Sequence, residues 1–188
     1  MFVLTVAASL ASLTLGTTQV AADLSTLSQG ADAIVHAKVI ESHARRTQDG
    51  MRIITDTTLQ VTESLKGDAK PETQVIVMQP GGVVGEIGQR VEGAATFKPG
   101  EEVVLFLEKR GDRFTMVGMS QGKFTIEKAS DGKATFAIPN AEHAGLLVDP
   151  ETHQPIASPL VTLELSKLKA QISQSLQNAR PAPKTTRP

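Results

Sequence analysis

Short segments in which apolar and polar residues alternate make up most of the chain, and this two-residue period constrains the fold more than any other feature. The longest such segment runs from Met51 to Ser64. The side chains on its apolar face are those of Ile53, Thr55, Thr57, Leu59 and Val61. A period of two is typical of a half-buried β-strand. A strand of this length must curve or contain a bulge, as the strands of small barrels do.

Six more segments have the composition of strands, at residues 33–39, 75–78, 103–107, 113–117, 123–127 and 134–138. Turn signals separate them, including Gln48-Asp49-Gly50 and Arg110-Gly111-Asp112, where glycine permits a tight turn. The segments 75–78 and 103–107 are apolar throughout, which is typical of the most buried strands of a sheet. We therefore predict a mainly-β fold, a small antiparallel OB-like barrel over residues 23–138.

Two helices are predicted beside the barrel. Asp23 is placed to cap a short helix over residues 24–29, which Gly30 ends. Residues 139–161 contain four prolines and little periodicity, so they are predicted to form a connector. Residues 162–179 are predicted to form a C-terminal amphipathic helix that packs on the barrel, with docking to a partner as the alternative. The tail, residues 180–188, is predicted to be disordered.

Residues 1–22 contain no charged side chain and resemble a secretory signal peptide. Small residues at Val20-Ala21-Ala22 suit cleavage before Asp23. The alternative is a buried N-terminal helix. Polar residues interrupt the apolar stretch, so a membrane span is not expected. We expect an exported bacterial protein, periplasmic or extracellular.

The composition excludes several classes of function. The chain has no Cys, Trp or Tyr and six Phe, so disulfides, cysteine-ligated metals and thiol nucleophiles are excluded. Its formal net charge is -1, which gives no electrostatic reason to bind nucleic acid. The four histidines are scattered and are predicted to be single surface residues rather than metal ligands. We expect no cofactor. Glu101 and Glu102 are predicted to be solvated turn charges.

Residues 118–122 read Gly-Met-Ser-Gln-Gly and match the G-x-S-x-G sequence of serine hydrolases. In that alternative Ser120 is the nucleophile, with Asp131 or Asp149 and then His143 or His153 completing the triad. Predicted strands flank the motif on both sides, whereas a nucleophile elbow joins a strand to a helix. We therefore prefer a tight corner at Gly118 and Gly122.

The glycine-rich segment from Pro80 to Arg90 is the most unusual in the chain. It lacks the Lys-Ser/Thr of a P-loop and the spacing of a dinucleotide-binding loop. Two interpretations remain: the glycines supply positive φ for a wide turn, or the segment is an exposed recognition loop. In the second interpretation the binding residues are Gly81, Gly82, Gly85, Glu86, Gly88, Gln89 and Arg90.

Three stretches resemble netrin-like modules, the group that includes the tissue inhibitors of metalloproteinases. They are ADAIV with AKV at residues 31–39, VTESLKG at residues 61–67 and PGEEVVLFL at residues 99–107. A group of uncharacterised exported bacterial proteins has the same order of segments. The resemblance covers about residues 31–108 and implies an OB-type barrel with flanking helices. The inhibitors place a mature N-terminal cysteine on the catalytic zinc of their target, and this chain has no cysteine, so that mechanism does not carry over.

The function that we expect is that of an exported, non-enzymatic module that binds a protein, with a protease as one possible target. The absence of a convincing catalytic group of residues favours this over the small secreted serine hydrolase that uses Ser120. Nucleic-acid binding by the barrel is a third hypothesis. The neutral charge and the lack of Tyr and Trp, which would stack on bases, argue against it.

Overall fold

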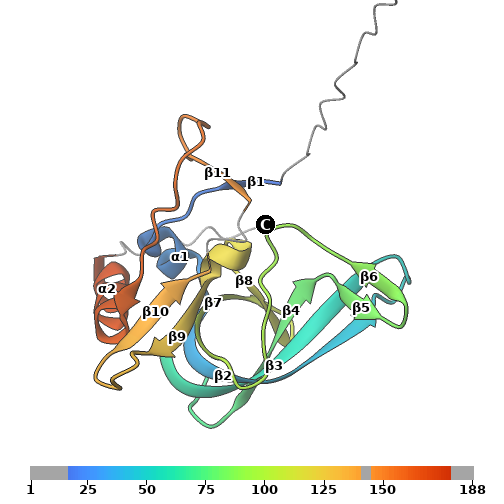
Figure 1. The fold of residues 1–188 in the computed structure, drawn as a ribbon, viewed down its shortest axis with the longest axis horizontal. Coiled ribbons are helices and arrows are strands. Elements are labelled where there is room, and N and C mark those ends of the chain that lie inside the picture. The colour runs from blue at the N-terminus through green and yellow to red at the C-terminus, as the bar shows by residue number, and fades with distance from the viewer. Residues whose placement is uncertain (1–16, 141–144, 179–188) are drawn as a thin grey trace, which may run out of the picture.

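The alternating segments are strands, and the fold is mainly β, as predicted (Figure 1). The computed structural model describes residues 17–140 and 145–178. The strands are β1 (Thr18–Val20), β2 (Ala33–Arg46), β3 (Ile53–Lys66), β4 (Gln74–Pro80), β5 (Gly82–Val84), β6 (Ile87–Gln89), β7 (Glu102–Arg110), β8 (Arg113–Met116), β9 (Lys123–Lys128), β10 (Thr135–Pro139), β11 (Leu146–Val148) and β12 (Leu163–Glu164). The helices are α1 (Leu24–Gly30) and α2 (Leu165–Asn178).

Five strands form a ring. Their order is β7-β2-β3-β4-β8, and β8 pairs back with β7. The neighbours are antiparallel except β4 and β8, which run parallel and meet at a single residue pair, Val77 with Phe114. The ring thus differs from the prediction in one parallel contact. Strands β9, β10 and β12 lie outside the ring and extend the sheet from β7.

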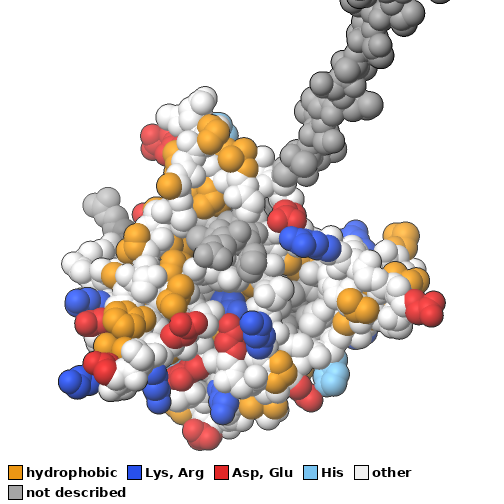
Figure 2. Space-filling view, viewed as in Figure 1, with side chains coloured by type: hydrophobic (Ala, Val, Ile, Leu, Met, Phe, Trp, Pro, Cys, Tyr) orange, Lys and Arg blue, Asp and Glu red, His pale blue; other side chains and the backbone are white. Residues whose placement is uncertain are grey.

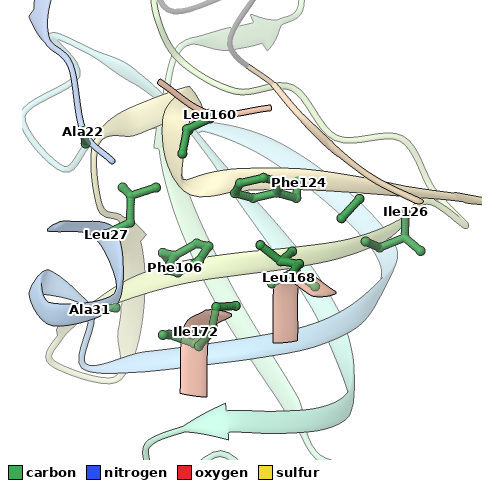
Figure 3. Close-up of a cluster of buried hydrophobic side chains, with 12 residues drawn as sticks. Ala22, Leu27, Ala31, Phe106, Phe124, Ile126, Leu160, Leu168 and Ile172 are labelled. Atoms are coloured by element: carbon green, nitrogen blue, oxygen red, sulfur yellow. The ribbon is translucent and has the colours of Figure 1, made fainter. Parts of the chain in front are cut away.

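Strand β7 separates two hydrophobic cores and is buried on both faces over Val103 to Leu107. Val103, Leu105 and Leu107 point into the ring, where they pack with aliphatic residues of β2, β3 and β4. Val104 and Phe106 belong to the outer core, which contains residues of both helices. Figure 3 shows Phe106 among the helix residues Leu27, Leu168 and Ile172. This double burial explains why the segment is apolar at every position rather than at alternate ones.

Strand β2 is longer than predicted and irregular. It pairs with β3 to Arg46, and the register shifts at three places, the last between Val39 and Glu41. Each shift is a bulge or irregularity of the kind that a strand needs to wrap around a small barrel. The residue left without a partner is Leu65 and then Thr62 of β3 at the first two shifts, and Ile40 of β2 at the third. The irregularity predicted for the segment Met51–Ser64 is therefore present on β3.

The G-x-S-x-G sequence forms the corner at which the chain leaves the ring. Gly118 has φ 65° and begins a 3-10 turn, Met119–Gly122. A Cβ on Gly122 would lie 2.2 Å from the carbonyl oxygen of Val117, so only glycine fits there. Because of this corner, β8 and β9 both pair with the same edge of β7 at different points along it. The predicted tight corner at Gly118 and Gly122 is confirmed.

The two helices cover the outer face of the sheet (Figures 1 and 3). Asp23 caps α1 as predicted, accepting a hydrogen bond from the backbone N–H of Thr26 at 2.7 Å. Lys66 Nζ donates to the carbonyls of Ser28 and Ala31 at the C-terminal end of α1, where a cation is favourable. Helix α2 begins at Leu165, three residues later than predicted, because Leu163 and Glu164 pair with β10 as β12.

The predicted connector and the end of the predicted signal peptide pair with each other. Strand β1 runs parallel to β11, and Ala21 and Ala22 are buried. The buried side chain of Gln121 binds this segment through two hydrogen bonds. Its Oε1 accepts from the backbone N–H of Ala22 at 2.9 Å, and its Nε2 donates to the carbonyl of Val20 at 3.1 Å. Cleavage before Asp23 would remove β1. Residues 1–16, which carry the rest of the signal-peptide prediction, and residues 180–188 lie outside the described residues.

Helix α2 is expected to stabilise the barrel by packing on it rather than to dock to a partner protein. Leu168 and Ile172 are fully buried against Phe106 and Phe124 (Figure 3). Leu168→Ala should cost about 2–5 kcal/mol of unfolding free energy, measured by urea denaturation. The exposed neighbour is the control: Gln171→Ala should change stability by less than about 0.5 kcal/mol. Equal stability of both variants would instead favour a docking helix.

Residues 17–22 are expected to be part of the stable fold. A variant that begins at Asp23 leaves both amide atoms of the buried Gln121, Oε1 and Nε2, without their backbone partners and uncovers Leu147. It should be less stable than a variant that begins at Thr17 by about 2 kcal/mol or more, since a buried polar group without a partner costs roughly 1–3 kcal/mol. Coinciding denaturation midpoints would show that β1 is dispensable.

Candidate functional site

The predicted recognition loop is a β-hairpin that projects from the end of the barrel opposite the helices (Figure 1). Strands β5 and β6 pair with each other and with no other strand in the described part of the chain, and Gly85 and Glu86 form their turn. Val83 on one strand is 68% exposed and Ile87 on the other 52%. Figure 2 shows hydrophobic side chains grouped at this end of the molecule. The tip of the segment is therefore exposed, as the interpretation as a recognition loop expects, whereas Gly81 at its base is buried.

Two of the glycines serve the hairpin's own structure. Gly81 has φ 91° and Gly82 φ 136°, both unfavourable for other residues. A Cβ on Gly81 would lie 2.7 Å from the carbonyl oxygen of Gln89, and one on Gly82 would lie 2.5 Å from Thr55 Oγ1. Thr55 Oγ1 also donates to the carbonyl of Gly81 at 2.7 Å, so the base of the hairpin is fixed to β3.

The three polar residues of the predicted site lie in different surroundings. Glu86 is exposed at the tip of the hairpin. Arg90 is also exposed and its Nε lies 3.4 Å from Glu92 Oε2. Gln89 is half-buried, and its Oε1 accepts from the backbone N–H of Ile53 at 2.7 Å.

A cavity of about 800 Å³ lies between the hairpin, the segment that follows it and the end of the barrel. Five of the seven predicted binding residues line it, and Gly85 and Glu86 at the tip do not. The five are Gly81, Gly82, Gly88, Gln89 and Arg90. The barrel contributes polar side chains that the sequence analysis did not assign to a site, namely Ser42, Thr55, Thr57 and Gln79.

The polar end of the barrel is visible in the sequence only as an interruption of an apolar row. Thr57 continues the inward-facing row of Leu59 and Val61 and is fully buried. Its hydroxyl lies 2.9 Å from that of Ser42 on β2. Gln79 likewise continues the inward row of Val75 and Val77 on β4. Polar residues at inward positions were the signal that could have located this cavity.

Buried side chains hold the outer wall of the cavity, residues 90–97, in place. This segment contains no helix or strand and crosses the barrel after β6 (Figure 1). Gln79 Nε2 donates to the carbonyl of Ala95 and Lys123 Nζ to that of Thr96, each at 2.6 Å. The backbone N–H of Ser120 donates to the carbonyl of Gly93 at 3.0 Å. Donors from three parts of the chain thus fix the wall.

Lys123 is buried and paired with Glu101. Its Nζ lies 2.7 Å from Glu101 Oε1 and 4.7 Å from the centre of the Phe97 ring. Glu101 Oε1 also accepts a hydrogen bond from Thr125 Oγ1. Burial lowers the pKa of Lys123 below its ordinary value, and the hydrogen bond and charge of Glu101 oppose that shift. The prediction that Glu101 is a solvated turn charge is wrong, because its side chain turns inward to this lysine.

Glu102 points to the other face of β7 and is not a free turn charge either. His36 Nε2 lies 2.7 Å from Glu102 Oε1, and Glu63, which pairs with Lys169 of α2, lies 4.0 Å from His36 Nδ1. His36 is buried, so its prediction as a surface residue is wrong, whereas His43 is exposed. Among residues 17–140 and 145–178, no three His, Asp or Glu side chains gather as metal ligands.

Ser120 lacks the surroundings of a nucleophile. Its side chain is fully buried, and its Oγ makes no hydrogen bond to any described residue. The positive φ next to the corner falls on Met119 rather than on Ser120. Asp149 accepts backbone hydrogen bonds from Glu151 and Thr152 within its own turn. His143 lies outside the described residues.

Two alanine variants test which glycines the structure of the hairpin requires. Gly82→Ala should cost about 2 kcal/mol or more, because the new methyl group meets Thr55 and Ala44 and the backbone is strained. Gly88→Ala, whose nearest contact would be 3.7 Å away, should be neutral or slightly stabilising. Urea denaturation measures both. Equal losses for the two variants would contradict the structural role of Gly82.

No protein-family model, no curated protein and no solved structure matches this chain. Within the described part of the chain, no helix is long and apolar enough to cross a membrane. The resemblance to netrin-like modules stays a prediction, and the function proposed below rests on the geometry of the hairpin and its cavity.

Proposed function

We propose that the chain is an exported, non-enzymatic module that binds a protein partner through the β5–β6 hairpin and the adjoining cavity. The observation that carries this proposal is the exposure of Val83 and Ile87 on a hairpin that projects from the barrel. Met51, in the turn between β2 and β3, is also largely exposed at this end of the molecule. Apolar side chains gathered on a projecting element are typical of protein interfaces.

The arrangement of the hairpin suits recognition. The base of the hairpin is fixed by the hydrogen bond from Thr55 to Gly81. The segment that follows it, residues 90–97, is fixed by hydrogen bonds from Gln79 and Lys123. A surface that is already ordered loses little conformational entropy when it binds, so more of the contact energy contributes to affinity. An exported protease is the class of target that the netrin-like resemblance implies.

The other two hypotheses have less support. Ser120 is buried without a hydrogen-bonded base among the described residues, so an esterase or protease activity at this position is not favoured. Single-stranded nucleic acid needs exposed aromatic rings, and none of the five described phenylalanines is exposed. These are Phe97, Phe106, Phe114, Phe124 and Phe136.

A photo-crosslinking amino acid placed at Val83 should join the protein to a partner in an extract of the source organism. The same amino acid at Val161, which is 60% exposed and belongs to the stretch before α2, is the matched control. Excess unlabelled protein should abolish the crosslink, and the Val83→Ser/Ile87→Ser variant should compete at least tenfold less well. Because both side chains are exposed, that variant should unfold at the same denaturant concentration.

Two outcomes would contradict the proposal. The first is a crosslink pattern from Val83 that equals the pattern from Val161. The second is full competition by the Val83→Ser/Ile87→Ser variant, which would place the interface elsewhere on the chain.

A further inference from the structure

The side chains that line the cavity indicate which kind of chemical group suits it as a ligand. At about 800 Å³ the cavity is within the range of roughly 300–1,000 Å³ that is typical of ligand pockets. Two of its lining residues carry a charge, Arg90 and Glu92, and they pair with each other on exposed side chains. The barrel end contributes only hydroxyl and amide groups, from Ser42, Thr55, Thr57 and Gln79. The barrel end of the cavity therefore carries no charged side chain that could pair with a charged ligand.

Gln79 presents a fixed acceptor to the cavity. Its side chain is 94% buried, since the residue is only 6% exposed, and its Nε2 donates to the carbonyl of Ala95. Only the nitrogen of an amide can donate, so this bond settles which way the group is turned. Its Oε1 accepts no hydrogen bond from any described residue, which leaves the carbonyl oxygen of Gln79 for a ligand.

Gln89 presents a fixed donor by the converse arrangement. Its Oε1 accepts from the backbone N–H of Ile53 at 2.7 Å, which turns the amide the other way. Its Nε2 donates to no described residue. Both residues line the cavity, so each has one amide atom without a described partner, an acceptor on Gln79 and a donor on Gln89, while the backbone holds the other amide atom.

A peptide group is the neutral unit that matches this pair, because it carries one N–H donor and one C=O acceptor. Sugars also carry neutral donors and acceptors, but their binding sites depend on exposed aromatic faces. This chain has no Trp or Tyr, and one face of Phe97 is covered by Lys123. The apolar part of the lining, which includes Val83, Val91, Ala95 and Phe97, suits small aliphatic side chains.

We infer that the cavity binds the main chain of an extended, uncharged segment of the partner protein. Gln79 accepts from a peptide N–H of that segment and Gln89 donates to a peptide carbonyl. This inference rests on the proposed function and adds to it the class of segment that is recognised. Val83, which is exposed and also lines the cavity, then contacts the partner next to the bound segment, while Ile87 lies on the other face of the hairpin.

A phage-displayed library of random linear heptapeptides is the probe that tests this. Selection on the immobilised protein should enrich peptides whose central residues are uncharged and small. Fluorescence anisotropy with the enriched peptides, acetylated and amidated at their ends, then compares the protein with Gln89→Glu. The carboxylate of that variant still accepts from Ile53 but cannot donate, so the dissociation constant should rise at least tenfold.

The control is Gln171→Glu, which makes the same change in net charge on the exposed side of α2 and should alter the dissociation constant less than twofold. A second measurement addresses the peptide rather than the protein. N-methylation of one central peptide nitrogen, which removes the donor to Gln79, should also weaken binding at least tenfold. Equal denaturation midpoints for the two protein variants would show that the fold is intact.

Three outcomes would overturn the inference: no peptide enriched above the blank support, binding that Gln89→Glu leaves unchanged, or oligosaccharides on a glycan array bound in a Gln89-dependent manner. Each is distinguishable from failure of the proposed function. If the Val83 crosslink persists while the peptides fail, the hairpin binds a protein but the cavity does not hold its main chain.

Discussion

The shape of the candidate site depends on hydrogen bonds from buried side chains to the carbonyl groups of residues 90–97. This segment has no helix or strand to fix it, so its carbonyls need partners elsewhere in the chain. Lys123 and Gln79 supply two of them, and the backbone of Ser120 supplies a third. The lysine is held in turn by Glu101, so a buried ion pair between β9 and the residue before β7 supports a surface wall. Removing one member of such a pair is costly, because the other charge stays buried.

Hydrogen bonds between side chains and the backbone also determine which polar atoms the cavity has available for a ligand. A glutamine that satisfies one backbone group has its other amide atom fixed in direction, and Gln79 and Gln89 do this with opposite senses. The hairpin is positioned by a comparable bond from Thr55 to Gly81. The barrel therefore provides a rigid support, while the exposed tip around Val83 and Ile87 stays available for a partner. Rigid scaffolds that carry recognition elements on their connecting segments are common among binding proteins.

Much of the fold follows from the sequence, and much of the site does not. The alternating period located β2 and β3, the all-apolar runs located β4 and β7, and Asp23 marked the start of α1. The pairing of β1 with β11 was missed because strands of three residues leave no periodic signal, and because an apolar N-terminal segment also resembles a signal peptide. The glycine-rich hairpin was found through its composition. The cavity wall was not, because Gln79 and Lys123 act on residues distant in sequence, and single polar residues within strands suggest outward faces. The surroundings of Glu101 and Glu102 were equally hard to predict, because the side chains of adjacent residues in extended backbone point to opposite sides.

Hydrogen–deuterium exchange of the Lys123→Met variant tests most directly whether these side chains hold the wall of the site. The variant keeps the length and apolar character of the side chain but removes its hydrogen bond to Thr96. Exchange of the backbone amides of Ser120, which donates to Gly93, and of Ala94, which donates to Val91, should accelerate at least tenfold more than exchange in β2 and β3. Lys98→Met, an exposed change on the following segment, should leave all rates unchanged. Uniform acceleration across the barrel, or unchanged exchange at Ser120 and Ala94, would contradict the claim that Lys123 fixes the wall.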